Sequence, residues 1–265
     1  MKLAVFGDIG GHAELFEQAL ISVGCDPSTG YVPDGLYVIQ VGDLVDRGPD
    51  SEGAFRIALN MMTGSCSDQY IQLIGNHEAQ YLGGPKFETP HSASELLGPN
   101  IKILKELRKE GRIKIAVGAI TEDGKPYLIT HAGLGPAFWG LYLARHEHLD
   151  KLVPALNSMG HKVFDAGWLL GSRDIPGPCW AMTWDEVIAA WLQQDIFDMP
   201  WNQVHGHHNL YKWDRQKATV HPLFVGELEV WPDRRISRFP VHGRYVYQID
   251  HSHKTESSHQ AQPQH

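Results

Sequence analysis

The stretch "GLYVIQVGDLVDRG", residues 35–48, decides the fold class. A short, mostly apolar run predicts a strand, and the Gly-Asp that follows it predicts a sharp turn at the carboxyl end of that strand. Four other stretches have the same design: "KLAVFGD" (2–8), "QYIQLIGN" (69–76), "YLITH" (127–131) and "NQVHGH" (202–207). The five predicted strands therefore each end in Asp, Asn or His. The first of them, at 2–6, is expected to be buried.

Helical patterns separate the first of these strands. Amphipathic helices are predicted at 13–24 and 51–64, and a charged helix at 101–110. Strand–helix–strand units of this length imply parallel pairing with right-handed crossovers. Residues 112–133 predict a hairpin with Asp123 and Gly124 in its turn. After a mainly helical region at 136–199, strands are predicted again within 202–209, 217–231 and 244–250.

The chain shows neither an internal repeat nor a convincing linker. We therefore expect a single α/β domain over residues 1–250, in which the segment 136–199 forms a helical, Trp-rich insertion and one wall of a cleft. Five tryptophans lie in this segment: Trp139, Trp168, Trp180, Trp184 and Trp191. An aromatic wall could stack a nucleobase, although tryptophans in a helical region more often fill a core. The His-rich tail, residues 251–265, is expected to be disordered because it has no large apolar side chain.

Composition disfavours several classes of protein. The net charge of −8 argues against a protein that coats nucleic acid. The three cysteines stand alone in the sequence, which argues against a disulfide framework or a cysteine-ligated zinc. No stretch is apolar enough to span a bilayer, and the first ten residues do not resemble a signal peptide. The sequence is therefore predicted to be cytoplasmic and not bound to a membrane, while its oligomeric state stays open.

Polar residues at several strand ends predict a metal site. In open α/β sheets, ligands bind in the crevice outside the carboxyl ends of the strands, where residues far apart in sequence converge. Asp, Asn and His without Cys form a ligand set for hard to borderline divalent ions. A single "GD" or "GN" is usually only a turn. The stretches "GDLVDRG" (42–48) and "GNHE" (75–78) are more specific, because each packs several polar residues directly behind an apolar strand.

Taken in order, the motifs "DIG" (8–10), "GDLVDRG", "GNHE", "THAG" (130–133) and "VHGHH" (204–208) resemble those of the calcineurin-like metallophosphoesterase superfamily. The resemblance is to its phosphoprotein phosphatase branch, with bacterial and phage-type serine/threonine phosphatases and diadenosine tetraphosphatase-like enzymes. It covers Asp8 to His207. It implies an α/β fold, a four-layer α/β/β/α sandwich of two facing mixed β-sheets, with a metal centre at the carboxyl ends of the strands.

The resemblance also implies the roles of individual residues in a two-metal hydrolase. The metal ligands would be Asp8, Asp43, Asn76, His131 and His207. Asp43 would bridge both ions, and the metal pair would activate a water for attack on phosphorus. His77 would protonate the leaving oxygen, with Asp46 orienting its ring, and Arg47 would grip the phosphoryl oxygens.

Two further assignments are less direct. His207 is preferred to its neighbours His205 and His208 because it follows Gly206, as the family pattern requires. Arg173 is a second candidate for contacting phosphate, but the commoner explanation is an arginine on the surface.

The stretch "GDIGGH", residues 7–12, departs from the family pattern, because Gly10 stands where the family has a histidine ligand of the first ion. His12 could take over if Gly10 and Gly11 fold the chain back, or it could simply begin a helix. Asn209, placed where other superfamily members have a further histidine, offers at best an oxygen. We therefore expect two divalent ions with a weaker first site, manganese being the leading candidate and iron, zinc or magnesium the others.

Two functions from different classes remain open. The first is an active metal-dependent phosphoesterase acting on a phosphorylated protein, a nucleotide or a small molecule, and the acidic balance disfavours nucleic acid as its substrate. The second is a catalytically weak phosphate- or nucleotide-binding homologue with an incomplete first metal site. Retention of Asp43, Asp46, Arg47 and His77 favours the enzyme.

Overall fold

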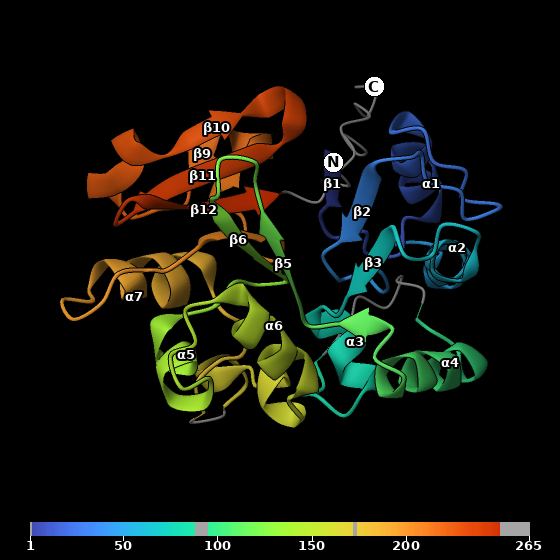
Figure 1. The fold of residues 1–265 in the computed structure, drawn as a ribbon, viewed down its shortest axis with the longest axis horizontal. Helices are drawn as coiled ribbons and strands as arrows, with labels where there is room; N and C mark the ends of the chain where they lie inside the picture. Colours follow the sequence, from blue (N-terminus) through green and yellow to red (C-terminus); the bar gives the residue numbers. More distant parts are fainter. Residues whose placement is uncertain (1, 88–94, 172–173, 250–265) are drawn as a thin grey trace, which may run out of the picture.

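The computed structural model describes residues 2–87, 95–171 and 174–249. The candidate residue Arg173 and the tail 251–265 lie outside these ranges. Figure 1 shows two β-sheets in the middle of the molecule, with helices around them. Within the described part of the chain, no helix is long and apolar enough to cross a membrane.

The first sheet is parallel throughout and has the order β1-β2-β3-β4. Its strands are β1 (Lys2–Phe6), β2 (Leu36–Gln40), β3 (Tyr70–Leu73) and β4 (Ile113–Lys114). Helices α1 (Ala13–Ser22), α2 (Ser51–Thr63) and α4 (Gly98–Lys109) complete its crossovers. The predicted parallel units are therefore confirmed. The expectation of a buried first strand was wrong: β1 lies at the sheet edge, so Lys2 and Leu3 are exposed.

The second sheet is mixed, with the order β10-β11-β12-β7-β6-β5. Its strands are β5 (Ala116–Ile120), β6 (Pro126–Thr130), β7 (Asn202–His205), β10 (Glu229–Trp231), β11 (Ile236–Val241) and β12 (Arg244–Ile249). Strand β7 pairs in parallel with both β6 and β12, and the other pairs are antiparallel. A separate two-stranded ribbon joins β8 (Tyr211–Lys212) to β9 (Lys217–Ala218).

The predicted helical region consists of short elements around the second sheet. They are α5 (Pro136–Tyr142), α6 (Leu149–Ser158), 3-10 turns at His161–Phe164 and Gly167–Leu170, a π-helix (Thr183–Ile188) and α7 (Ala189–Leu192). Trp139 and Trp191 are fully buried and pack with Trp201 and Phe197, so they fill a core. Whether the segment also forms a cleft wall stays a prediction, as does the single domain.

A small apolar core joins the two sheets. Ile39 and Leu73 of the first sheet pack with Ile129 of the second, and half-buried valines surround them. The sheets therefore face each other, while the larger core lies under the helices that cover their outer sides. The predicted α/β sandwich is confirmed, with the refinement that only the second sheet is mixed.

Two segments differ from the predicted strand pattern. The run 112–120 is divided at Ile115: β4 pairs in the first sheet and β5 in the second. The Asn157 side chain holds this crossing, because its Oδ1 accepts from Ile115 N (2.7 Å) and Ala116 N (3.1 Å). The segment 217–231 was predicted as strand, but a 3-10 helix at Pro222–Glu227 interrupts it. The remaining 3-10 turns are Trp213–Arg215 and Pro232–Arg234.

Candidate metal centre

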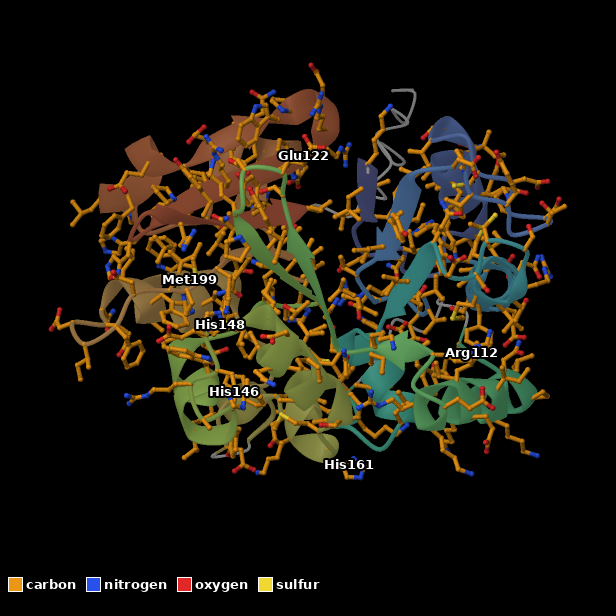
Figure 2. All side chains as sticks on the ribbon, in the orientation of Figure 1. Arg112, Glu122, His146, His148, His161 and Met199 are labelled. Carbon is orange, nitrogen blue, oxygen red and sulfur yellow. The ribbon has the colours of Figure 1, made fainter. Side chains whose placement is uncertain are left out.

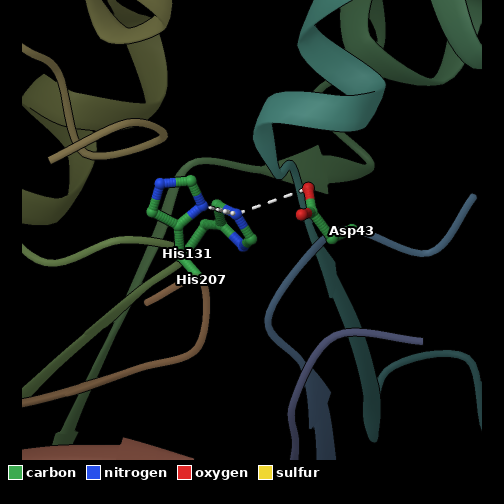
Figure 3. Close-up of side chains that lie close together, drawn as sticks. All are labelled: Asp43, His131 and His207. Atoms are coloured by element: carbon green, nitrogen blue, oxygen red, sulfur yellow. Dashed lines mark hydrogen bonds and ion pairs between the residues drawn. The ribbon is translucent and has the colours of Figure 1, made fainter. Parts of the chain in front are cut away.

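Three polar side chains from both sheets meet at the carboxyl ends of their strands. Asp43 follows β2, His131 follows β6 and His207 follows β7. Figure 3 shows the three side chains pointing toward one another. One ligand atom from each lies within 4.8 Å of the other two, the only such group of His, Cys, Asp and Glu among the residues that the structure describes. Asn76, the first residue of α3 (Asn76–Tyr81), adds an amide at the same place.

Nitrogen and oxygen atoms of four side chains converge there. His131 Nε2 lies 3.3 Å from Asp43 Oδ1, 3.1 Å from Asn76 Oδ1 and 3.1 Å from His207 Nδ1. The other ring nitrogen of His131 donates to the carbonyl oxygen of Val41 at 3.0 Å, so Nε2 carries the lone pair. The carbonyl oxygen of Asn76 likewise faces only acceptors. A cation satisfies such a cluster; without one, a flip that exchanges the oxygen and nitrogen of the Asn76 amide would satisfy it instead.

Electrostatics keep these ligands in the form that binds a cation. Burial lowers the pKa of His131, and burial with the neighbouring His208 holds the pKa of His207 well below its usual range. Both imidazoles are therefore neutral at neutral pH. Burial acts to raise the pKa of Asp43, but the surrounding His131, His77 and Arg47 outweigh it, and the pKa is lowered. The donor set of two imidazoles, one carboxylate and one amide oxygen fits a divalent ion.

Asp8 reaches this centre from β1. Its Oδ1 accepts from the backbone N–H of His207 at 3.1 Å and lies 3.9 Å from His131 Nδ1. A Cβ at Gly206 would lie 2.4 Å from that same oxygen, so the glycine before His207 is required by close approach. Burial and the nearby Asp43 raise the pKa of Asp8 well above its usual value. A cation beside two buried carboxyls would relieve this repulsion.

The loop with the missing histidine is folded onto the Asp43 loop. The backbone N–H groups of Ile9 and Gly10 both donate to the carbonyl oxygen of Asp43, at 2.8 and 2.7 Å. Gly10 and Gly11 have φ of +53° and +71°, which side chains rarely adopt. His12 is the residue just before α1 and is half-buried. It is not part of the group around His131, and its role stays a prediction.

The other alternative ligand, Asn209, has its side-chain oxygen engaged elsewhere. Its Oδ1 accepts from Gln248 Nε2 at 2.7 Å, and Gln248 is a fully buried residue of β12. Its neighbour His208 packs against His207, with ring centroids 4.1 Å apart. His205 is fully buried, and its Nδ1 lies 2.9 Å from the carbonyl oxygen of Gly206.

His77 lies beside the cluster with one ring nitrogen anchored. Its Nδ1 lies 2.9 Å from Asp46 Oδ2, and its backbone N–H donates to Asp43 Oδ1 at 3.0 Å. Asp46 also accepts from Gln80 Nε2 (2.7 Å) and the Tyr81 hydroxyl (2.6 Å), so its carboxylate is well fixed. Since a carboxylate only accepts, Nδ1 is the protonated nitrogen. His77 Nε2 is buried, makes no hydrogen bond with any described residue and lies 3.8 Å from Asp43 Oδ2.

The backbone is strained where these side chains are presented. Asp43, Asp46, Arg47 and His207 have φ of +53°, +67°, +64° and +63°, values that are uncommon for residues other than glycine. Arg47 is exposed and forms no ion pair or hydrogen bond within the described part of the chain. It is close enough to lower the pKa of Asp43. Its guanidinium is therefore available to an anion.

Sequence reasoning assigned no role to Glu78, although it belongs to the "GNHE" motif. Its carboxylate accepts from four buried N–H groups: Asp43 N, Leu44 N and Gly75 N at 2.8 Å, and Val45 N at 3.2 Å. These bonds tie the loop after β2 to the loop after β3. Burial, followed by the nearby Asp43, raises the pKa of Glu78 to about 7. The sequence signal that could have indicated this role is an acidic residue directly after His77, at the end of a buried strand.

Comparison with known proteins agrees with the motifs. A family model described as calcineurin-like phosphoesterase matches residues 1–234. The symmetrical bis(5'-nucleosyl)-tetraphosphatase of Acidovorax sp. (strain JS42) is 32% identical over 142 residues, 51% of this chain and 45% of that protein. The protein of the same name from Chromohalobacter salexigens is 29% identical over 163 residues, 59% of this chain and 53% of its own length. The chain thus spans about half the length of these curated relatives.

Solved structures support the fold. A mutant of a cold-active protein tyrosine phosphatase has a TM-score of 0.52 at 15% identity, covering 94% of this chain and 71% of that one. The cold-active protein-tyrosine phosphatase of a Shewanella species has a TM-score of 0.50 at the same identity and coverage. Since the family model covers most of the chain and the fold agrees with it, the chain belongs to the calcineurin-like phosphoesterase family.

Proposed function

We propose that the protein is a metal-dependent phosphoesterase in which His77 is the general acid. The observation that carries this proposal is the meeting of one potential ligand atom each from Asp43, His131 and His207, directly beside an imidazole whose Nε2 has no hydrogen-bond partner among the described residues. Members of this family use divalent ions. Hydrolysis of a phosphate ester by metal-activated water requires a group of metal ligands and an anchored proton donor at the same place.

The residues divide between two ions. One would be held by Asp43, Asn76, His131 and His207, a mixed nitrogen and oxygen set. The other would share Asp43 and rely on Asp8 and water, because Gly10 supplies no ligand. Divalent ions held by these residues would supply a water that is nucleophilic enough to attack phosphorus. Oxygen-rich sites favour harder, more weakly held ions, so manganese is the leading candidate for the weaker site.

The side chains around the metal ligands would bind the phosphoryl group and transfer a proton to the leaving oxygen. The Arg47 guanidinium, which has no ion pair or hydrogen bond with a described residue, would bind two phosphoryl oxygens at once, a geometry that lysine does not match. Asp46 keeps the proton on His77 Nδ1 and fixes the ring. Nε2 is thereby directed to the site. In the imidazolium form of His77, Nε2 also carries a proton, which it gives to the leaving oxygen, and the ring is left neutral with its proton on Nδ1.

A nucleotide with linked phosphates is our first candidate substrate. Its support is the name of the relatives, symmetrical bis(5'-nucleosyl)-tetraphosphatases, which match about half of this chain. Diadenosine tetraphosphate, a serine phosphopeptide and a 3′-phosphorylated oligonucleotide form a panel that separates the substrate classes. Fastest hydrolysis of the dinucleotide would support this choice, and preference for the peptide would overturn it.

Hydrolysis of p-nitrophenyl phosphate with added manganese tests the proposed activity. With phenyl phosphate, whose basic leaving oxygen needs a proton, His77→Ala should lower turnover about 10²- to 10⁴-fold, the usual contribution of a general acid, with metal content unchanged. His148→Ala is the matched control, because His148 is exposed and lies at the junction to α6, on the helical side of the molecule (Figure 2). Undetectable hydrolysis by the manganese-loaded wild type, together with binding of phosphate, would instead support the weak phosphate- or nucleotide-binding protein.

A further inference from the structure

An aromatic pair borders the candidate site on the side of the proposed acid. The Phe87 ring meets His77 edge to face, with centroids 4.8 Å apart and planes at 88°. Phe87 in turn meets Trp180 at 5.2 Å and 87°, and Trp180 meets His207 at 6.0 Å and 81°. We call Phe87 and Trp180 the aromatic bridge. It links the proposed acid to a metal ligand through side chains that are more than ninety residues apart in sequence.

The two members of the bridge differ in burial. Trp180 is only 5% exposed and belongs to the main core, so it is a fixed support. Phe87 is half-buried and packs against that core from the segment that follows α3. One side of Phe87 therefore rests on Trp180, and its contact with His77 lies at the border of the site. A half-buried phenylalanine can be replaced with less damage to the fold than a buried tryptophan.

The contact with Phe87 restricts an orientation of the His77 ring that the hydrogen bond to Asp46 does not fix. That bond fixes Nδ1, but one hydrogen bond alone permits the imidazole plane to tilt about the line that joins Nδ1 to Asp46. Edge-to-face packing on Phe87 opposes this tilt, since aromatic pairs prefer this arrangement. Nε2, which has no hydrogen-bond partner within the described residues, depends on such packing for its direction.

We propose that Phe87 is a positioning residue for His77 and makes the enzyme competent for esters with poor leaving groups. The inference rests on the proposed function. Phe87 transfers no proton and binds no metal; it holds the imidazole so that the Nε2 proton reaches the leaving oxygen. Proton donation matters most when the leaving oxygen is strongly basic, so loss of this alignment is revealed by the identity of the leaving group.

The experiment compares two substrates in manganese-loaded protein. Phenyl phosphate leaves as a basic phenolate that needs a proton, whereas p-nitrophenyl phosphate leaves as a stable anion. Phe87→Ala should lower kcat for phenyl phosphate about 10-fold and for p-nitrophenyl phosphate by less than about 3-fold, with KM nearly unchanged. Phe87→Leu, which keeps apolar bulk, should fall between. Phe224→Ala is the matched control, because Phe224 is also half-buried and packs on Trp184 and Phe239 instead.

A double-mutant cycle shows whether Phe87 acts through His77. In the His77→Ala background, Phe87→Ala should change kcat for either substrate by less than about 2-fold, because the group that it positions is gone. A second measurement needs no activity. In metal-free protein labelled at histidine nitrogen, exchange of the His77 Nδ1 proton with water should speed up in Phe87→Ala and not in Phe224→Ala.

The outcomes separate the inference from the proposed function. Equal losses for both substrates, or losses that multiply in the double mutant, would overturn the positioning role while leaving the phosphoesterase intact. Wild-type protein that hydrolyses neither ester would remove the proposed function, and the positioning role with it. A selective loss for phenyl phosphate that disappears without His77 would establish the role.

Discussion

Gly75→Ala tests how tightly the two loops of the centre fit. Gly75 has φ −95° and ψ −178°, extended backbone that alanine adopts freely. Its added methyl group, however, would lie 2.2 Å from Asp43 Oδ1 and 2.3 Å from Asp43 N. The substitution therefore acts through steric conflict alone, at the point where the loop after β3 touches the loop after β2.

The size of the effect follows from those contacts. They must open from 2.2 Å to at least 3.0 Å. Because one of the contacted atoms is the backbone nitrogen of Asp43, which Glu78 already holds, movement of the Asp43 side chain alone does not relieve the conflict. Overpacking of this kind costs about 1–3 kcal/mol of unfolding free energy, and we expect about 3 kcal/mol. A displacement of about 1 Å at a catalytic group costs about 10²-fold in turnover, so activity should fall by that factor as well.

Urea unfolding followed by circular dichroism measures the stability, and calorimetric titration measures manganese affinity. Gly226→Ala is the control, because Gly226 is exposed in the 3-10 helix Pro222–Glu227 and, its chain neighbours aside, no described atom outside that helix lies within 4 Å of its added methyl. It should be neutral or stabilising by up to about 1 kcal/mol. If Gly75→Ala unfolds at the same urea concentration as Gly226→Ala and binds manganese like the wild type, the close approach of these loops is wrong.

Three further predictions concern the histidines and the first-ion loop. His12→Ala should keep both metal equivalents and lower activity by less than about 3-fold, and loss of one equivalent by metal analysis would show that His12 is a ligand. Gly10→His should tighten the weaker manganese site in a calorimetric titration but cost metal-free protein about 1 kcal/mol, because its φ of +53° is left-handed. Burial lowers the pKa of His205 to about 4 in the folded protein, from its ordinary value of 6.5. Above pH 6.5 the residue is neutral in both states and costs no stability. As the pH falls from 6.5 toward 4, only the unfolded chain takes up the proton, and about 3 kcal/mol of unfolding free energy is lost. His205→Asn should flatten the acid side of the stability profile of metal-free protein in urea unfolding, and an unchanged profile would contradict this.

The strands of the site could be predicted because their signal is local. A β-branched run followed by Gly and a polar residue marks both the strand and its functional end, as at Val41 to Asp43. Parallel strands of one sheet end at the same edge, so His131 and His207, which follow β6 and β7, lie together although far apart in sequence. Asp43, which follows β2 of the first sheet, reaches them because the two sheets face each other. The parallel units of the first sheet follow from the same local pattern.

The structural features that the sequence patterns did not predict depend on contacts between segments far apart in the chain. Asn157 decides that the chain changes sheets at Ile115, and no local pattern at 112–120 reveals it. Exposure of β1 depends on its place at the edge, which only the topology determines. The four N–H groups that converge on Glu78 and the edge contact of Phe87 with His77 likewise exist only after folding.

Anomalous X-ray scattering from crystals of the protein soaked in manganese tests the central claim most directly. The account predicts a strong peak within bonding distance of Asp43 Oδ1, Asn76 Oδ1, His131 Nε2 and His207 Nδ1, and a weaker second peak near Asp8. The stronger peak should disappear in His131→Ala crystals soaked in the same way. A fully occupied manganese ion elsewhere, with no peak among these four atoms, would contradict the assignment of the metal centre.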